Sequence, residues 1–215
     1  MPSLLTYGDS NTYGTLPIEY DGHRARLGPQ DRWPGVTRKQ LGPEWDIIEH
    51  GLPGRTTQYP DAEMGPHMDG RIGLFIALES HGPLDILSIM LGTNDTKTAF
   101  GNSPADIAGG IDTLLSIALS DEMQDRHGGL DVLLICPPAV IETGELAPQF
   151  IGGHEKSLAL PDLYGALADR HDVDFLNAGA LIQSSPVDGV HFGADQHAIL
   201  GKAVARAVQG MMILT

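Results

Sequence analysis

The sequence predicts an α/β fold of three layers, α/β/α, in which helices cover both faces of a five-stranded, mostly parallel sheet. Short apolar runs rich in Leu, Ile and Val alternate with longer segments of helical spacing, and this alternation continues to the C-terminus. A length of 215 residues is enough for one sizeable core. Because no repeat, low-complexity tract or linker divides the chain, we expect a single domain over residues 1–215.

The candidate strands are five apolar runs, and nearly continuous apolar sequence is typical of parallel strands that are buried on both faces. They span residues 3–8, 45–50, 84–91, 131–136 and 173–177. The one cysteine of the sequence, Cys136, ends the fourth run, so we expect a buried, unreactive thiol and no internal disulfide.

The candidate helices lie between these strands. They span residues 35–41, 70–81, 104–121, 154–171 and 194–212. Pro104 suits the first turn of its helix, where a missing N–H has no cost. Residues 15–34 and 137–153 are irregular, and two interpretations stay open for them: solvated loops, or pocket walls and subunit contacts.

The charge balance and the absence of long apolar stretches exclude several classes of partner. The chain has 13 Lys and Arg against 28 Asp and Glu, so a net charge of −15 disfavours nucleic acid. No apolar stretch approaches the roughly 20 residues that span a bilayer. Residues 1–8 resemble a core strand and not a leader, so we expect a cytoplasmic protein without a membrane partner.

Polar residues follow four of the five candidate strands, at the edge where ligands bind in open α/β sheets. These segments are Gly-Asp-Ser-Asn-Thr at 8–12, Gly-Leu-Pro-Gly-Arg at 51–55, Gly-Thr-Asn-Asp at 92–95 and, beyond a further loop, Asp-Gly-Val-His-Phe at 188–192. Ser10 would lie where a strand turns into a helix, and helix N–H groups there would favour a negatively charged intermediate. The alternative is that Ser10 only caps the helix.

Asp188 and His191 favour the catalytic interpretation of Ser10. A serine hydroxyl becomes a good nucleophile when a neutral imidazole takes its proton, and a carboxylate fixes the tautomer of that imidazole. A separation of three residues lets Asp188 and His191 meet locally. The remaining histidines show no paired spacing such as His-x-x-x-His, so we expect no metal; they are His23, His50, His67, His81, His127, His154, His171 and His197.

Asn94 and Gly54 are candidate donors to a developing oxyanion, together with the N–H of Ser10. Asn94 offers an amide N–H, and Gly54 lets its backbone N–H approach a ligand without a side chain in the way. Donors of this kind contribute on the order of 3 kcal/mol each to transition-state stabilisation. The alternative is that both are ordinary turn residues.

In this order, the four segments resemble the SGNH (GDSL) hydrolase family, which is named for its serine, glycine, asparagine and histidine. These residues fall here on Ser10, Gly54, Asn94 and His191, and Asp188 matches the family's Asp-x-x-His. The segments run from residue 8 to residue 192, so the resemblance covers most of the chain. It implies a flavodoxin-like three-layer fold, an acyl-serine intermediate and no cofactor.

Longer strings at residues 32–36, 49–57, 89–97 and 188–192 are similar to the bacterial arylesterase/acyltransferase branch of that family. The branch implies small aryl or alkyl esters as substrates, acyl transfer to alcohols or peroxide as well as to water, and a homo-oligomer that narrows access to the site. Two residues depart from its pattern. Asn11 replaces an apolar residue after the nucleophile, and Pro53 replaces a small polar residue beside the oxyanion donor, so both are candidate substrate-binding residues.

Val190, Phe192 and Phe150 are candidates for an apolar wall beside the ester, with ordinary core packing as the alternative. Residues 211–214, Met-Met-Ile-Leu, would either be buried at a subunit interface or pack within the monomer. Two other functions stay open. A carbohydrate acetylesterase of the same family would have an open polar cleft, and a non-catalytic binding module with the same fold would leave Ser10 unlabelled by an organophosphate.

Overall fold

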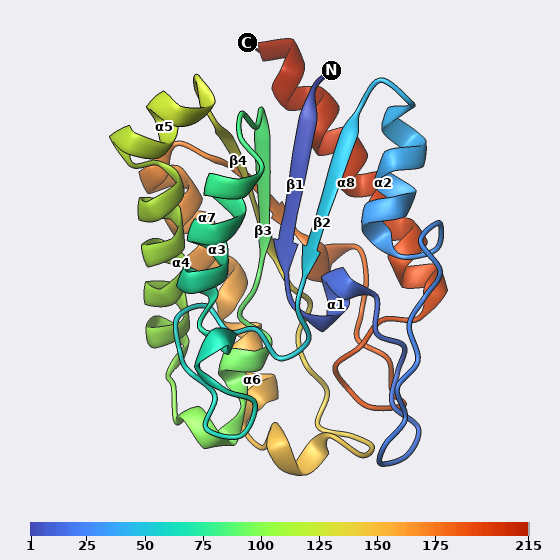
Figure 1. Cartoon of the computed structure of the whole chain (residues 1–215). Helices are drawn as coiled ribbons and strands as arrows, with labels where there is room; N and C mark the ends of the chain where they lie inside the picture. The colour runs from blue at the N-terminus through green and yellow to red at the C-terminus, as the bar shows by residue number, and fades with distance from the viewer. Residues whose placement is uncertain (215) are drawn as a thin grey trace.

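The centre of the fold is a five-stranded sheet in which every pair of neighbours is parallel, in the order β2-β1-β3-β4-β5 (Figure 1). The computed structural model describes residues 1–214, and side chains up to residue 213. The strands are β1 (Ser3–Gly8), β2 (Asp46–Gly51), β3 (Ile86–Met90), β4 (Asp131–Cys136) and β5 (Asp174–Asn177). The predicted fold class is confirmed, and the sheet is wholly and not mostly parallel.

Helices cover both faces of this sheet. The longer ones are α2 (Trp33–Leu41), α3 (Gly70–Ser80), α4 (Pro104–Ala118), α5 (Asp121–His127), α6 (Gly153–Leu158), α7 (Leu160–His171) and α8 (Ala194–Leu214), and a short α1 (Ser10–Tyr13) follows β1. One apolar core lies between the sheet and α3, α4, α5 and α7, and a second lies between the sheet and α2 and α8 (Figure 1). Alternate residues of β1 supply the two cores, with Leu5 in the first and Leu4 in the second.

Two of the predicted helices are wrong in extent. The helix predicted at 154–171 is two helices, α6 and α7, because Pro161 lies in the first turn of α7 and cannot donate to a preceding turn. The helix predicted at 104–121 ends at Ala118, and Ser120 then caps α5, which the sequence analysis did not predict. The Oγ of Ser120 accepts a hydrogen bond from the N–H of Met123.

Cys136 and the C-terminal helix test two further expectations. Cys136 is fully buried as expected, and burial raises the pKa of its thiol to about 12. Met211 packs in the core, whereas Ile213 is 81% exposed, and the side chain of Leu214 lies outside the described residues. No helix of the described part of the chain has both the length and the apolar character of a membrane span.

Helices α2 and α8 are joined by a buried histidine. His197 Nδ1 accepts the N–H of Trp33 at 3.1 Å, while its Nε2 has no partner among the described residues. Gly201, one turn further, allows the helices to approach, because a Cβ there would lie 2.7 Å from the carbonyl oxygen of Trp33. Burial, helped by the nearby charge of His191 and opposed by that of Asp195, lowers the pKa of His197 from 6.5 to about 4.

We predict that His197 makes the protein acid-sensitive. Between pH 6.5 and 4 the unfolded chain binds a proton at this imidazole that the folded chain excludes, so the free energy of unfolding falls as the pH falls. The expected loss is about 2–3 kcal/mol, at roughly 1.4 kcal/mol per pKa unit. A His197→Asn variant keeps an acceptor for Trp33 but cannot titrate. Urea unfolding of both proteins from pH 7 to 4 should show a shallower decline for the variant; parallel curves would refute the assignment.

Candidate active site

The first part of the site forms where β1 ends. Gly8 is its last residue, and Asp9 caps α1 by accepting the N–H of Asn11 at 2.9 Å. Ser10, the first residue of α1, is 6% exposed. A helix of four residues has little macrodipole, so a negative charge near Ser10 would depend on individual N–H groups and not on the helix as a whole.

Asp188, His191 and Ser10 are linked in a row by two hydrogen bonds, although Ser10 is far from the other two residues in the sequence. His191 Nδ1 is 2.6 Å from Asp188 Oδ2, and His191 Nε2 is 3.0 Å from Ser10 Oγ. Because an ionised carboxylate only accepts, the proton of a neutral imidazole belongs on Nδ1. Nε2 is then an acceptor for the serine hydroxyl, which is the state in which a histidine can remove a proton.

Asp188 is held in place by several donors. Its Oδ1 accepts the backbone N–H groups of Val190 and His191 at 3.0 and 2.9 Å, and its Oδ2 accepts that of Ile18 at 2.7 Å. Burial raises the pKa of this carboxyl, but the hydrogen bond and charge of His191 and these N–H groups outweigh burial, and the net effect is a lowered pKa. The carboxylate therefore stays ionised and fixes the imidazole ring.

Gly54 lies in a tight turn after β2. The N–H of Arg55 donates to the carbonyl of Leu52 at 3.1 Å, with Pro53 and Gly54 between them, and Gly54 has φ +90°. Pro at the second position and a positive φ at the third are features of a type II turn. The peptide N–H of Gly54 takes no part in the turn's hydrogen bond, and no acceptor for it is found among the described residues. Gly54 is therefore both a turn residue and a candidate oxyanion donor, because the turn leaves its N–H without an acceptor among the described residues.

Asn94 follows β3 and reaches the same place. It opens a short 3-10 helix (Asn94–Thr96), and its Nδ2 donates to the carbonyl of Arg55 at 3.0 Å. Asp9 Oδ2 lies 3.4 Å from the same nitrogen. The amide therefore sits between the turn that carries Gly54 and the cap that precedes Ser10, so the structure brings all five sequence-predicted catalytic candidates to one edge of the sheet.

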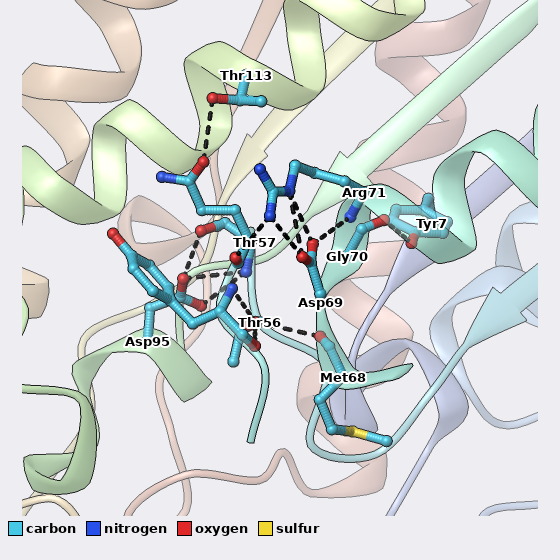
Figure 2. Close-up of polar contacts among 11 residues, drawn as sticks. Tyr7, Thr56, Thr57, Met68, Asp69, Gly70, Arg71, Asp95 and Thr113 are labelled. Atoms are coloured by element: carbon cyan, nitrogen blue, oxygen red, sulfur yellow. Dashed lines mark hydrogen bonds and ion pairs between the residues drawn. The ribbon is translucent and has the colours of Figure 1, made fainter. Parts of the chain in front are cut away.

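Asp95 links the segment after the Gly54 turn to the segment that follows β3. Its two oxygens accept the N–H of Thr57 at 3.0 and 3.1 Å, and its Oδ1 also accepts the Thr57 hydroxyl at 2.5 Å (Figure 2). Burial raises the pKa of Asp95 to about 6, although the hydrogen bonds from Thr57 oppose that rise. No local spacing in the sequence predicts this role for Asp95, because its partner Thr57 lies on another loop.

A half-open cavity of about 660 Å³ lies over Ser10, His191, Gly54 and Asn94. Pro53, Phe150 and Val190 are among the residues that line it. Phe150 and Val190 also pack with Val140 in a small buried cluster, so they take part in core packing as well. Phe192 does not line the cavity, because it packs in the core with α8. The side chain of Asn11 also lies outside the wall: its Nδ2 donates to the carbonyl of Val190 at 3.1 Å and so holds α1 against the His191 loop.

The two irregular segments supply much of the remaining wall. Several residues between Thr15 and Arg26 and between Glu145 and Phe150 line the cavity, so these parts of the two segments are pocket walls. Charged side chains lie among them, including Asp21, Arg24 and Glu145, and Lys97 contributes from the segment after Asn94. No single residue in these segments signals this role; only their irregular length did. No cluster of three or more potential metal ligands occurs in the described part of the chain.

The chain is similar to a family of acylhydrolases and to several solved structures that are described as esterases. A sequence model of the GDSL-like lipase/acylhydrolase family matches residues 6–199. Est24, a carbohydrate acetylesterase from Sinorhizobium meliloti, is 37% identical with a TM-score of 0.93, and the alignment covers 98% of this chain and 100% of that one. An aryl esterase from M. smegmatis is 36% identical, also with a TM-score of 0.93, over 98% and 99% of the two chains.

A third solved structure extends the likeness to another organism. A putative arylesterase from Agrobacterium tumefaciens is 34% identical with a TM-score of 0.87, over 98% of this chain and 99% of that one. No curated protein sequence matches the chain significantly. The similar structures thus include enzymes described as acting on aryl esters and on acetylated carbohydrates.

Proposed function

The chain belongs to the GDSL-like lipase/acylhydrolase family and is an ester hydrolase, and from that premise we propose that it is a serine esterase acting on small carboxylic esters with Ser10 as its nucleophile. The observation that supports the proposal is the row of hydrogen bonds from Asp188 through His191 to Ser10, with contacts of 2.6 and 3.0 Å. Gly54, whose N–H has no acceptor among the described residues, and Asn94 line the same cavity as Ser10 and His191. A location in the cytoplasm stays a prediction.

Acylation follows from this geometry. Ser10 Oγ attacks the ester carbonyl carbon while His191 Nε2 takes the hydroxyl proton, and Asp188 stabilises the imidazolium that forms. The carbonyl oxygen becomes an oxyanion that accepts from the N–H groups of Ser10 and Gly54 and from Asn94. When the C–O bond to the alcohol breaks, His191 returns its proton to the leaving oxygen, which leaves an acyl-serine.

Deacylation repeats these steps with a new nucleophile. Water, an alcohol or hydrogen peroxide gives its proton to His191 Nε2 and attacks the acyl carbon, and Ser10 Oγ leaves with that proton. The products are a carboxylic acid, a new ester or a peracid, respectively. The share of the acyl group that each acceptor receives depends on how well the cavity binds that acceptor relative to water. The apolar residues beside Ser10 therefore influence this partition.

The lining of the cavity favours aryl and alkyl esters near the nucleophile. Leu52, Pro53, Phe150 and Val190 contribute apolar surface, which holds an organic acyl or alcohol group better than it holds water. Carbohydrate acetates are the second candidate, because charged and polar side chains also line the cavity and because Est24 is described as a carbohydrate acetylesterase. Parallel assays of aryl acetates and acetylated sugars would separate the two.

We predict that Ser10→Ala removes nearly all esterase activity while the fold persists. Removal of the nucleophile from a serine triad lowers kcat on the order of 10⁶-fold, and at least about 10⁴-fold is expected here. The assay is hydrolysis of a p-nitrophenyl ester, with thermal unfolding as the check on folding. Ser120→Ala, which removes a helix cap far from the cavity, serves as the matched control and should stay active. Substantial turnover by the Ser10 variant would refute the nucleophile.

We predict ester exchange when an alcohol is added. The acyl-serine should partition between water and the alcohol, so a new ester should appear beside the free acid in proportion to alcohol concentration. Gas chromatography of both products measures that partition, and the Ser10→Ala protein under the same conditions reports uncatalysed exchange. If free acid alone forms even at high alcohol concentration, the acyltransferase and perhydrolase proposal fails and plain hydrolysis remains.

We also propose a homo-oligomer. Apolar side chains are exposed on the outer face of α3, where Ile72, Phe75 and Ile76 share one side, and Met212 and Ile213 are exposed near the C-terminus. Surfaces of this kind are commonly covered by a partner subunit. Multi-angle light scattering at working concentration should give a mass of at least twice the chain mass of 22.9 kDa. The mass of a single chain would contradict the proposal.

A further inference from the structure

Arg55 places a guanidinium group beneath the catalytic edge of the sheet, where the chemistry above does not use it. The side chain belongs to a residue that is 3% exposed. Its Nη1 donates to the carbonyl oxygens of Gly8 at 2.8 Å and His50 at 2.5 Å, and its Nη2 lies 3.3 Å from His50 Nδ1. One side chain thus joins the ends of β1 and β2 at the level where both strands stop.

This guanidinium forms no ion pair with a carboxylate of the described residues, and its Nε is buried without a partner. Burial lowers the pKa of Arg55, although Tyr7 and Asp9 favour its charged form. Burial of a charge without a paired carboxylate is unfavourable for stability. A side chain that only joined two strands would not require a charge. We therefore look for the role of Arg55 in the segments that it holds in position.

Packing leaves the guanidinium little freedom. Its Cζ lies 4.1 Å from the centre of the Tyr7 ring, and the Tyr7 hydroxyl donates to the carbonyl of Gly70 (Figure 2). Helix α3 closes over both groups at Gly73, where a Cβ would lie 2.6 Å from the tyrosine oxygen and 3.2 Å from Nη2 of Arg55. The guanidinium is therefore fixed by an aromatic face on one side and a helix backbone on the other.

The segments that Arg55 contacts are those that carry the oxyanion donors. Gly8 comes two residues before Ser10, and Arg55 itself follows Gly54 and closes its turn through the N–H bond to Leu52. The backbone carbonyl of Arg55 accepts Asn94 Nδ2 at 3.0 Å. The three segments that carry the candidate donors are thus linked through one residue, although only Asn94 bonds to it with its own donor group. Such donors stabilise charge only where their positions are fixed before the reaction.

We propose that Arg55 is a positioning residue that fixes the relative positions of the Ser10, Gly54 and Asn94 donors, an inference that rests on the proposed serine esterase function. Arg55 is not among the residues that line the cavity, and its hydrogen bonds go to Gly8, His50, Leu52 and Asn94. Its removal should leave binding of the ester intact and impair stabilisation of the tetrahedral intermediate, which a role in stability alone would not do.

The test compares Arg55→Met with Arg55→Lys and a control, Arg38→Met. Arg38 also braces β2, through the carbonyl of Ile47 at 2.5 Å and an ion pair with Glu49, but it lies away from the cavity. For each protein we would measure kcat, KM, thermal stability and the inhibition constant of phenylboronic acid. That compound adds to a serine hydroxyl and presents a tetrahedral oxygen to the oxyanion donors, so it reports on them directly.

The proposal predicts a kcat reduced on the order of 10²-fold in Arg55→Met, the size of the effect of losing one oxyanion donor, with KM changed less than about threefold and boronic acid affinity reduced in parallel with kcat. Arg55→Lys should recover part of both losses, because an ammonium can still donate to Gly8 and His50. Arg38→Met should lose thermal stability without change in kcat.

An unchanged kcat and boronic acid affinity in a folded Arg55→Met protein would overturn the proposal. If Arg55→Met does not fold, Arg55→Lys decides: a selective loss of kcat and boronic acid affinity supports the proposal, and wild-type values overturn it. Ser10→Ala is assayed beside them. Turnover that survives in that variant shows failure of the proposed function itself, whatever the Arg55 variants do.

Discussion

The hydrogen bond between Ser10 and His191 depends on the whole chain folding correctly, because it joins residues near the two ends of the sequence. Ser10 follows the interior strand β1, and His191 precedes the last helix, α8. In a parallel sheet every strand delivers its carboxyl end to the same edge, so residues 181 positions apart can meet there at 3.0 Å. Asn11 strengthens the meeting point, since its amide donates to the carbonyl of Val190 and links α1 directly to the histidine loop.

Around this bond the protein buries polar groups that cost stability. Burial raises the pKa of Asp9 and of Asp95 to about 6, so their ionisation lowers the free energy of unfolding as the pH rises from about 4 to 6. Arg55 is buried without an ion pair to any of the described residues. Each of these groups holds a loop that carries a candidate catalytic residue: Asp9 caps α1, Asp95 holds Thr57, and Arg55 holds Gly8. Active sites commonly combine such destabilising burial with fixed geometry.

The sequence allowed the fold and the reacting groups to be predicted for the same reason, which is that both are local signals. Buried parallel strands appear as apolar runs, and the Asp188–His191 spacing places an acid and an imidazole within one loop. Helix limits were less predictable: Pro161 divides one predicted helix, and the Ser120 cap starts another. The roles of Asp95 and Arg55 were missed because their partners lie elsewhere in the chain: Thr57 is on a loop, and Gly8 and His50 are on β1 and β2. For Phe192 the sequence left two interpretations open, a cavity wall and core packing, and the structure places its side chain in the core.

The central claim is that Ser10 is made nucleophilic by His191 in the folded protein. The most direct measurement is labelling with a fluorophosphonate, followed by mass spectrometry of the intact protein and of its peptides. The account predicts one adduct per chain, located on Ser10, with a strongly reduced labelling rate in a His191→Ala variant. A folded protein that takes up no adduct, or takes it up equally fast without the imidazole, would contradict the claim and would favour a binding module that shares the fold.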